Sequence, residues 1–155
     1  MFLRNHRGTV IILIIALVMG LIMTFAALIV DKLAFNYSNI FKIWAMIALS
    51  IILVSLFVPY KAWGERLAKL CGCREGTAPF KLISGIVPSL VLNTFITVLV
   101  SAANILYNPA IPAEHQMGEW ISGMLHDWPI TLVISYLASF IAEFAGVKIA
   151  ERCVE

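Results

Sequence analysis

Lys42, His126 and Asp127 are the residues of this sequence best suited to charge or proton chemistry. When the chain is aligned with itself, residues 42–44 and 126–128 fall at equivalent places near the ends of two long apolar segments. Charges in apolar surroundings are costly, so they normally pair or face a cavity. We therefore expect a Lys42–Asp127 ion pair, with His126 beside it as a proton acceptor or metal ligand. The alternative is a polar belt made of a snorkelling lysine and a helix-capping aspartate.

Glu143 is the one carboxylate inside a long apolar segment. An acid in such surroundings is a hypothesis of proton or cation handling. Glu143 also lies about one helical turn from Lys148, so it can instead reach the polar boundary of the segment. There it can pair with Lys61 or Arg66.

Carboxylate and imidazole side chains that follow the third apolar segment can bind a first-row divalent metal. They are Glu114, His115, Glu119 and His126. Their spacing matches no established metal motif. No cofactor is evident from the sequence.

Three cysteines, Cys71, Cys73 and Cys153, provide the thiols of the chain. Three thiolates can hold zinc or copper(I), but C-x-C lacks the second cysteine pair of a zinc ribbon. We therefore expect free thiols.

A stripe of polar side chains runs along one apolar segment at steps of four, four and three residues. It consists of Asn93, Thr97, Ser101 and Asn104. These steps place the four side chains on one face of a helix. The stripe either lines a path for a solute or ion, or makes hydrogen bonds to other helices worth roughly 0.6–2 kcal/mol each. We favour hydrogen bonding, and we expect Pro88 to bend this helix near its start.

Four long apolar segments must position these residues: Val10–Val30, Ile43–Val58, Leu82–Leu106 and Ile130–Ala150. A bilayer core of roughly 30 Å requires about 20 apolar residues in helical form. With 61% hydrophobic and 13% charged residues, the chain cannot cover its surface with polar groups in water. The segments lack the alternation of barrel strands, so the spans should be helices. The sequence predicts an all-α integral membrane protein, a four-transmembrane-helix bundle that forms one domain over residues 1–155.

The positions of Lys and Arg predict the orientation, because short loops rich in these residues stay in the cytoplasm. They gather before the first segment, between the second and third, and after the fourth: Arg4, Arg7, Lys61, Arg66, Lys69, Arg74, Lys81, Lys148 and Arg152. Only Lys32 and Lys42 remain for the other face, so both termini are expected in the cytoplasm. The basic start is also typical of a secretory signal, but the length of the apolar run favours a retained helix. Glu65 and Glu75 within the basic loop favour contact with lipid over nucleic acid.

Small residues at helical spacing predict the packing faces of the first and fourth helices, because close approach drives association in lipid. They are Ala16, Gly20, Thr24 and Ala27, and then Ser135, Ala138, Ser139, Ala142 and Gly146. Apolar residues also recur at helical spacing within residues 113–127. That stretch is expected to be an amphipathic helix on the outer surface, or to run straight into the fourth helix with a kink at Pro129.

The two halves of the chain share a plan of helix, outer connection, helix and basic tail. The repeats cover residues of about 8–70 and 81–152, and aligning them places residues 23–25 opposite 93–95. Because both halves begin on the cytoplasmic side, they are expected to be parallel helical-hairpin repeats.

Trp120, residues 126–130 and the basic end formed by Lys148 and Arg152 resemble the bacterial domain of unknown function 2798. Members of this family look like a hairpin of two membrane helices with a Trp-x-x-Ala start, an Ala-Trp-Pro-like step and a basic end. The resemblance is clearer in the second half than in the first, where Trp44 and a later proline are the main matches. It implies tandem membrane hairpins and no established chemistry.

These features predict a non-enzymatic protein of a bacterial inner membrane, since motifs of phosphate loops, zinc proteases and serine hydrolases are absent from the sequence. Our first hypothesis is that it binds or passes a small solute or ion through a polar interior, as an oligomer. The second is a structural or regulatory subunit of a larger membrane complex, without a ligand. The third is a metal-dependent or redox membrane protein that uses His126, Asp127 or the cysteines.

Overall fold

The computed structural model describes residues 7–106 and 108–154, and this part of the chain contains helices and no strand. The helices are α2 (Arg7–Val30), α3 (Tyr37–Phe57), α4 (Tyr60–Leu70), α5 (Ala78–Ile105) and α6 (Ala113–Val154). Of these, α2, α3, α5 and α6 are long and apolar enough to cross a membrane. The prediction of an all-α chain with four candidate spans is therefore confirmed, and these helices point to a multi-pass membrane protein.

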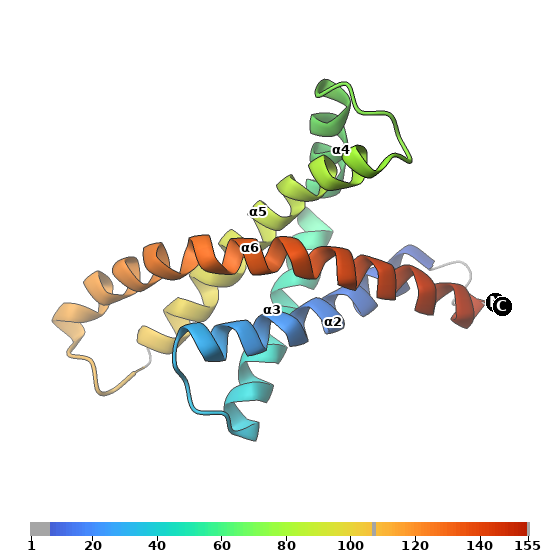
Figure 1. Ribbon diagram of the computed structural model, residues 1–155. Coiled ribbons are helices and arrows are strands. Elements are labelled where there is room, and N and C mark those ends of the chain that lie inside the picture. Colours follow the sequence, from blue (N-terminus) through green and yellow to red (C-terminus); the bar gives the residue numbers. More distant parts are fainter. Residues whose placement is uncertain (1–6, 107, 155) are drawn as a thin grey trace.

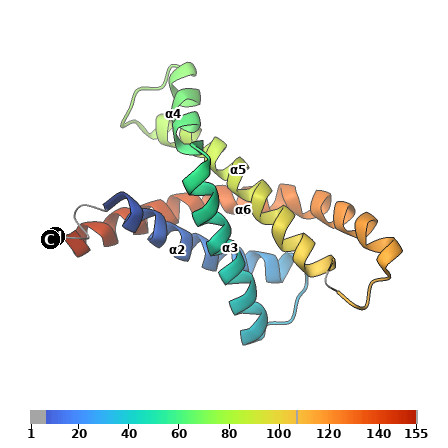
Figure 2. The ribbon, with the colours of Figure 1, turned by 180° about the vertical axis from the view of Figure 1, so that it is seen from behind.

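The helices form two crossing pairs (Figures 1 and 2). α2 and α6 lie side by side and run in opposite directions. On one face of this pair α3 packs against α2, α5 packs against α6, and α3 and α5 cross each other. The α2–α3 and α5–α6 connections lie at one end of the molecule, which we call the turn end. At the opposite end, α4 and the start of α5 diverge from the start of α2 and the last turns of α6. We call this the α4 end.

Short polar residues begin two of the helices. Asn36 caps α3 by accepting a hydrogen bond from the backbone N–H of Asn39 at 2.8 Å, and Thr77 caps α5 by accepting one from Phe80 at 3.4 Å. Pro59 follows the end of α3, and the residue before it is extended, as is usual before proline. The basic segment expected as a loop between the second and third spans is therefore partly helical, because it contains α4.

One continuous helix, α6, runs from Ala113 to Val154 and covers 42 residues. Of the two expectations for residues 113–127, the structure selects the one in which this stretch continues into the fourth span. The fourth helix thus begins before Ile130, and Asp127 lies inside it and does not cap a helix. At 1.5 Å per residue α6 is about 60 Å long, roughly twice the thickness of a hydrocarbon core. α3 also begins before the predicted Ile43, at Tyr37.

Small residues line the contact between α2 and α6. The buried members of the predicted faces are Ala16, Gly20, Thr24, Ala27, Ser135, Ala138, Ala142 and Gly146, while Ser139 is half-buried. A Cβ atom added at Gly146 would lie 3.0 Å from Cγ1 of Ile15, so the two helices approach as closely as a glycine allows. The predicted packing faces of both helices are confirmed.

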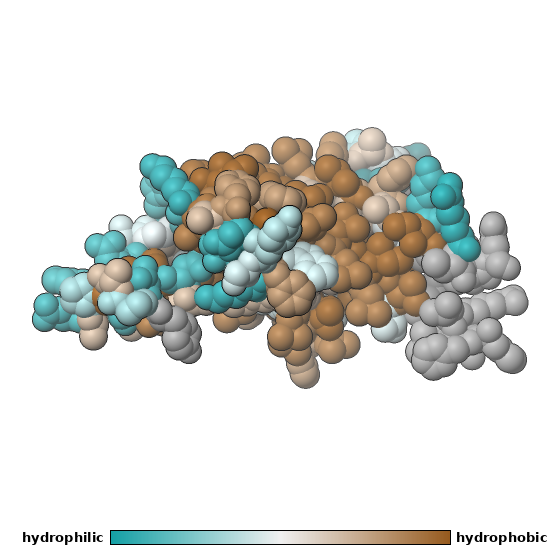
Figure 3. All heavy atoms as spheres, turned by 90° about the horizontal axis from the view of Figure 1, so that it is seen from below, coloured by the Kyte–Doolittle hydropathy of each residue, from teal (hydrophilic) through white to brown (hydrophobic). Residues whose placement is uncertain are grey.

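Large apolar side chains face outward along the spans. On α2 they recur every four residues, at Leu13, Leu17, Leu21 and Phe25, each more than 40% exposed. Figure 3 shows hydrophobic surface across the middle of the molecule and hydrophilic side chains towards its ends. A surface this apolar is unfavourable in water and matches the hydrocarbon of a bilayer.

Candidate functional site

Two carboxyl groups meet at the turn end, between α2 and α6. Asp31 directly follows the last residue of α2, and Asp127 lies on α6, within hydrogen-bonding reach of Asp31. Both line a cavity of about 20 Å³ whose polar wall includes Thr97, Ser101 and Thr131. That volume is enough for one water molecule. We call Asp31 and Asp127 the acidic pair.

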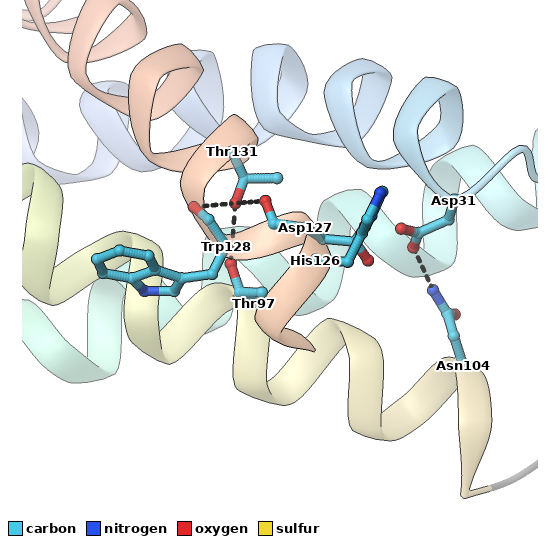
Figure 4. Close-up of polar contacts among 7 residues, drawn as sticks. All are labelled: Asp31, Thr97, Asn104, His126, Asp127, Trp128 and Thr131. Atoms are coloured by element: carbon cyan, nitrogen blue, oxygen red, sulfur yellow. Dashed lines mark hydrogen bonds and ion pairs between the residues drawn. The ribbon is translucent and has the colours of Figure 1, made fainter. Parts of the chain in front are cut away.

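Each carboxyl group of the acidic pair has a further polar neighbour (Figure 4). The amide of Asn104, at the end of α5, donates a hydrogen bond to Oδ2 of Asp31 at 3.0 Å. Nδ1 of His126 lies 2.8 Å from Oδ1 of Asp127, and the His126 side chain is largely exposed. Asp127 is much less so, with 17% of its side chain accessible. The pair is thus partly shielded from water and flanked by one amide and one imidazole.

Burial and the neighbouring carboxylate of Asp127 raise the pKa of Asp31 to about 6, while the hydrogen bond from Asn104 opposes this shift. Both effects disfavour the charged form of Asp31, so this carboxyl group keeps its proton up to a higher pH than a free aspartate does. The arrangement is chemically suited to taking up a proton, or to exchanging that proton for a small cation.

The polar stripe on α5 faces the interior and is hydrogen-bonded to α6 and α2. Asn93 donates to the carbonyl of Trp128 at 3.1 Å. Thr131 donates to the Asp127 carbonyl at 2.9 Å, which leaves its hydroxyl oxygen to accept from Thr97 at 3.2 Å. These contacts are the interhelical hydrogen bonds that we favoured for the stripe.

The rest of the stripe is hydrogen-bonded as well. Nε1 of Trp120 on α6 donates to the Ser101 hydroxyl at 3.0 Å. Asn104, the last member, donates to Asp31, which directly follows the end of α2. The stripe therefore joins three helices around the acidic pair.

Two buried polar atoms have no hydrogen-bond partner in the described part of the chain, namely Oδ1 of Asn93 and Oγ of Ser135. Both residues are completely buried. An unsatisfied acceptor inside a protein is unusual, because it forfeits the hydrogen bond that water would provide. Such atoms are places where a water molecule or a cation can be accommodated.

A second cavity, of about 110 Å³, lies at the α4 end between α2, α4, α5 and α6. Its charged lining residues are Lys61, Glu65, Lys81 and Glu143, and we call it the mixed-charge cavity. It adjoins a wider hollow of about 450 Å³ that shares Glu65, Lys81 and Glu143.

The two cavities lie along the same helices. On α2 the lining passes from Met19 in the mixed-charge cavity to Met23 in the smaller one, and on α5 from Leu92 to Ile96. On α6 it passes from Ser139 to Thr131, with Ser135 midway between them. We call this α2–α5–α6 contact the central seam. One of the two unpartnered atoms, Ser135 Oγ, thus belongs to the residue that separates the cavities on α6.

Lys42 does not join the site at the turn end. It is exposed on α3, which packs against α2 and α5, and no ion pair links it to Asp127 in the described residues. The expected partner of Asp127 is therefore replaced by another acid. Asp31 was not among the residues we predicted, although it continues the small-residue face of α2 four positions after Ala27.

Glu143 is exposed at the α4 end and lines the mixed-charge cavity together with Lys61, one of its two expected partners. Arg66, the other, is not part of the lining, and no ion pair joins Glu143 to either within the described chain.

The described residues contain no group of three side chains arranged to bind a metal. A carboxylate oxygen of Glu114 lies 3.6 Å from Nε2 of His115 on the surface, and Glu119 is exposed. His126 forms its ion pair with Asp127 and with none of the other three candidate ligands in the described residues. Cys71 and Cys73 are free, as expected, while the side chain of Cys153 lies outside the described part of the structure.

No protein-family model, curated protein or solved structure matches this chain. The geometry of its own side chains is therefore the basis for assigning a function, and the resemblance to the domain of unknown function 2798 stays a prediction.

Proposed function

We propose that this chain is a carrier of protons or small cations in a bacterial cytoplasmic membrane, with the acidic pair as its binding site. The observation that carries the proposal is that Asp31 and Asp127 open onto the same central seam as the mixed-charge cavity at the other end. Two carboxyl groups in a poorly hydrated place are suited to exchanging a proton for a cation.

Polar atoms continue along the central seam between the two cavities. Thr131, Ser135 and Ser139 follow one another on α6 at steps of four residues, which is about 6 Å of helix per step. Asn93 contacts α6 beside them through its hydrogen bond to Trp128. The unpartnered oxygens of Asn93 and Ser135 offer intermediate acceptors for a hydrated proton or cation.

Apolar side chains close the seam between the cavities. They are Met19, Met23, Leu92 and Ile96, all nearly inaccessible. The cavity at the α4 end has about 110 Å³ and the one at the turn end about 20 Å³. This difference supports a carrier that opens to one side at a time, in a state open at the α4 end.

The same proposal places both termini in the cytoplasm and builds the chain from two hairpin repeats. The concentration of Lys and Arg in and after α4 supports a cytoplasmic α4 end. In the first hairpin, Nε1 of Trp44 donates to the Leu17 carbonyl at 3.2 Å, and in the second, Nε1 of Trp128 donates to Thr94 at 3.0 Å. Both tryptophans tie the second helix of a hairpin to the first, although at different heights, and this supports an internal repeat. The apolar outer faces leave room for a second copy, so we include a homo-oligomer.

A structural or regulatory subunit without a ligand is the second candidate. Direct hydrogen bonds between helices occupy most of the polar stripe, as in the pair of Thr97 and Thr131. A purely structural role would explain this pairing, but it gives no reason for two acids in contact.

The test is a flux measurement in liposomes that contain the purified protein and an entrapped pH-sensitive dye. A potassium diffusion potential of either sign should drive proton movement above that of empty liposomes. Replacing Asp31→Asn or Asp127→Asn should lower the protein-dependent flux at least about tenfold, because proton uptake needs a titratable group. Repeating the measurement with an inward sodium or potassium gradient would show whether a cation exchanges with the proton.

Glu119→Gln is the matched control, because Glu119 is an exposed acid on the same helix and lines neither cavity. Its flux should equal that of the unmodified protein. A flux no higher than in empty liposomes, under every gradient, would remove the carrier and leave the structural candidate.

A further inference from the structure

We infer that the mixed-charge cavity binds a group that carries a phosphate and a primary ammonium together, as the headgroup of an aminophospholipid does. This inference does not rest on the proposed carrier, because its four charged residues are not the acidic pair, although the carrier proposal uses the same cavity as its opening at the α4 end.

The cavity brings together unlike charges from three helices. Lys61 and Glu65 come from α4, Lys81 from α5 and Glu143 from α6. No ion pair within 4.0 Å joins any two of these side chains in the described chain. All four side chains are exposed, so they are accessible to a ligand that carries both signs of charge.

The balance of charge selects the kind of ligand. Two ammonium groups, on Lys61 and Lys81, match the oxygens of a phosphate. Two carboxylates, on Glu65 and Glu143, repel a ligand that is only anionic, and they accept hydrogen bonds from a primary ammonium. A quaternary ammonium has no N–H to donate, so it satisfies these carboxylates less well.

Hydroxyl and aromatic groups complete the surroundings. Ser84 and Ser139 add hydroxyl groups to the wall of the cavity. Tyr60 is buried there, and its hydroxyl is hydrogen-bonded to Ser55. Burial raises the pKa of Tyr60, so its hydroxyl stays neutral. The volume of about 110 Å³ is several times that of the small cavity at the turn end, which has room for one water.

The wider hollow offers an exit for an acyl chain. Phe140, Phe144 and Val147 of α6 line it, and Phe144 is 68% exposed on the apolar surface. In Figure 1 this region lies where α4 and the start of α5 diverge from the last turns of α6. Trp63 on α4 is also partly exposed, as tryptophans at a membrane boundary often are. A headgroup in the cavity can therefore keep its tails in the bilayer.

Native mass spectrometry of the purified protein with three lipids tests the inference. Phosphatidylethanolamine should bind about tenfold more tightly than phosphatidylcholine or phosphatidylglycerol. Glu143→Gln should remove the preference for ethanolamine over choline, and Lys81→Gln should weaken both. Lys69→Gln is the control, because Lys69 pairs with Glu75 at 2.7 Å and does not line the cavity. All the altered side chains are exposed, and elution as a single species would verify folding.

Soluble phosphoethanolamine forms the second arm and distinguishes the source of the ligand. Competition by this compound at concentrations similar to the lipid would support the same chemistry with a water-soluble ligand, and failure to compete would assign the site to lipid. Equal binding of phosphatidylglycerol and phosphatidylethanolamine, or an unchanged preference in Glu143→Gln, would overturn the inference.

Discussion

At the scale of residues, the acidic pair makes the stability of the fold depend on pH. The pKa of Asp31 is raised from 3.8 to about 6, so the folded protein binds a proton that the unfolded chain releases near pH 4. Protonation therefore stabilises the fold, fully below about pH 4 and less as the pH rises through 6.

We expect the thermal unfolding temperature in detergent to increase when the pH falls from 7.5 to 5. Asp31→Asn mimics the protonated state and should abolish this increase, while Glu119→Gln should retain it. A wild-type unfolding temperature that falls over this interval would contradict the raised pKa of Asp31.

Replacing Ser135 should affect the stability of the protein and its proposed transport differently. Its hydroxyl oxygen is buried without a partner, so Ser135→Ala should leave the free energy of unfolding unchanged or raise it by about 1 kcal/mol. The same change should lower the flux proposed for the central seam. Thr97→Val is the comparison, because it removes a hydroxyl that is hydrogen-bonded to Thr131 and should cost about 0.6–1.7 kcal/mol. Unfolding in mixed detergent micelles measures both.

At the scale of helices, the contact between α4 and α5 depends on one glycine. A Cβ atom at Gly64 would lie 2.1 Å from the backbone oxygen of Ser84, where no side chain can move aside. Gly64→Ala should therefore displace α4 and destabilise the protein by about 1–3 kcal/mol. Gly118→Ala on α6 meets no atom within 4 Å and should be neutral or slightly stabilising. Equal melting temperatures of the two variants would refute this packing.

Sequence reasoning was most successful where a helix face is defined by local spacing. The buried small residues of α2 and α6 and the inward stripe of α5 follow from periodicity alone, because lipid forces polar and small groups towards other helices. The continuity of α6 was one of two alternatives and could not be decided, because a proline inside a helix can either end it or kink it. Leu125 and Pro129 both lie on an exposed face, so the carbonyl that loses its partner is free to bond outside the bundle.

Contacts between distant parts of the chain were the least predictable. Asp127 was paired with Lys42 because the repeat aligns them, yet α6 packs along α2 and meets Asp31. Which helices become neighbours depends on the fit of whole faces, such as that of Gly146 against Ile15. A pattern within one segment does not contain that information.

At the scale of the whole molecule, the orientation can be tested with single cysteines. In a background where the native cysteines are serine, Asn108→Cys should react with a membrane-impermeant maleimide added to intact cells, and Arg74→Cys should react only after lysis. The reason is that Asn108 lies in the turn-end connection and Arg74 follows α4. Reaction of both from the same side would disprove the proposed topology.

The unbroken course of α6 has a mechanical consequence. Asp127 and Glu143 are separated by 16 residues of one helix, or about 24 Å at 1.5 Å per residue. On this one helix, Asp127 belongs to the acidic pair and Glu143 lines the mixed-charge cavity. Pro129 lies between the two residues and removes one backbone hydrogen bond, so the helix can bend there when the charge beside Asp31 changes, and such a bend displaces Glu143 relative to Asp127.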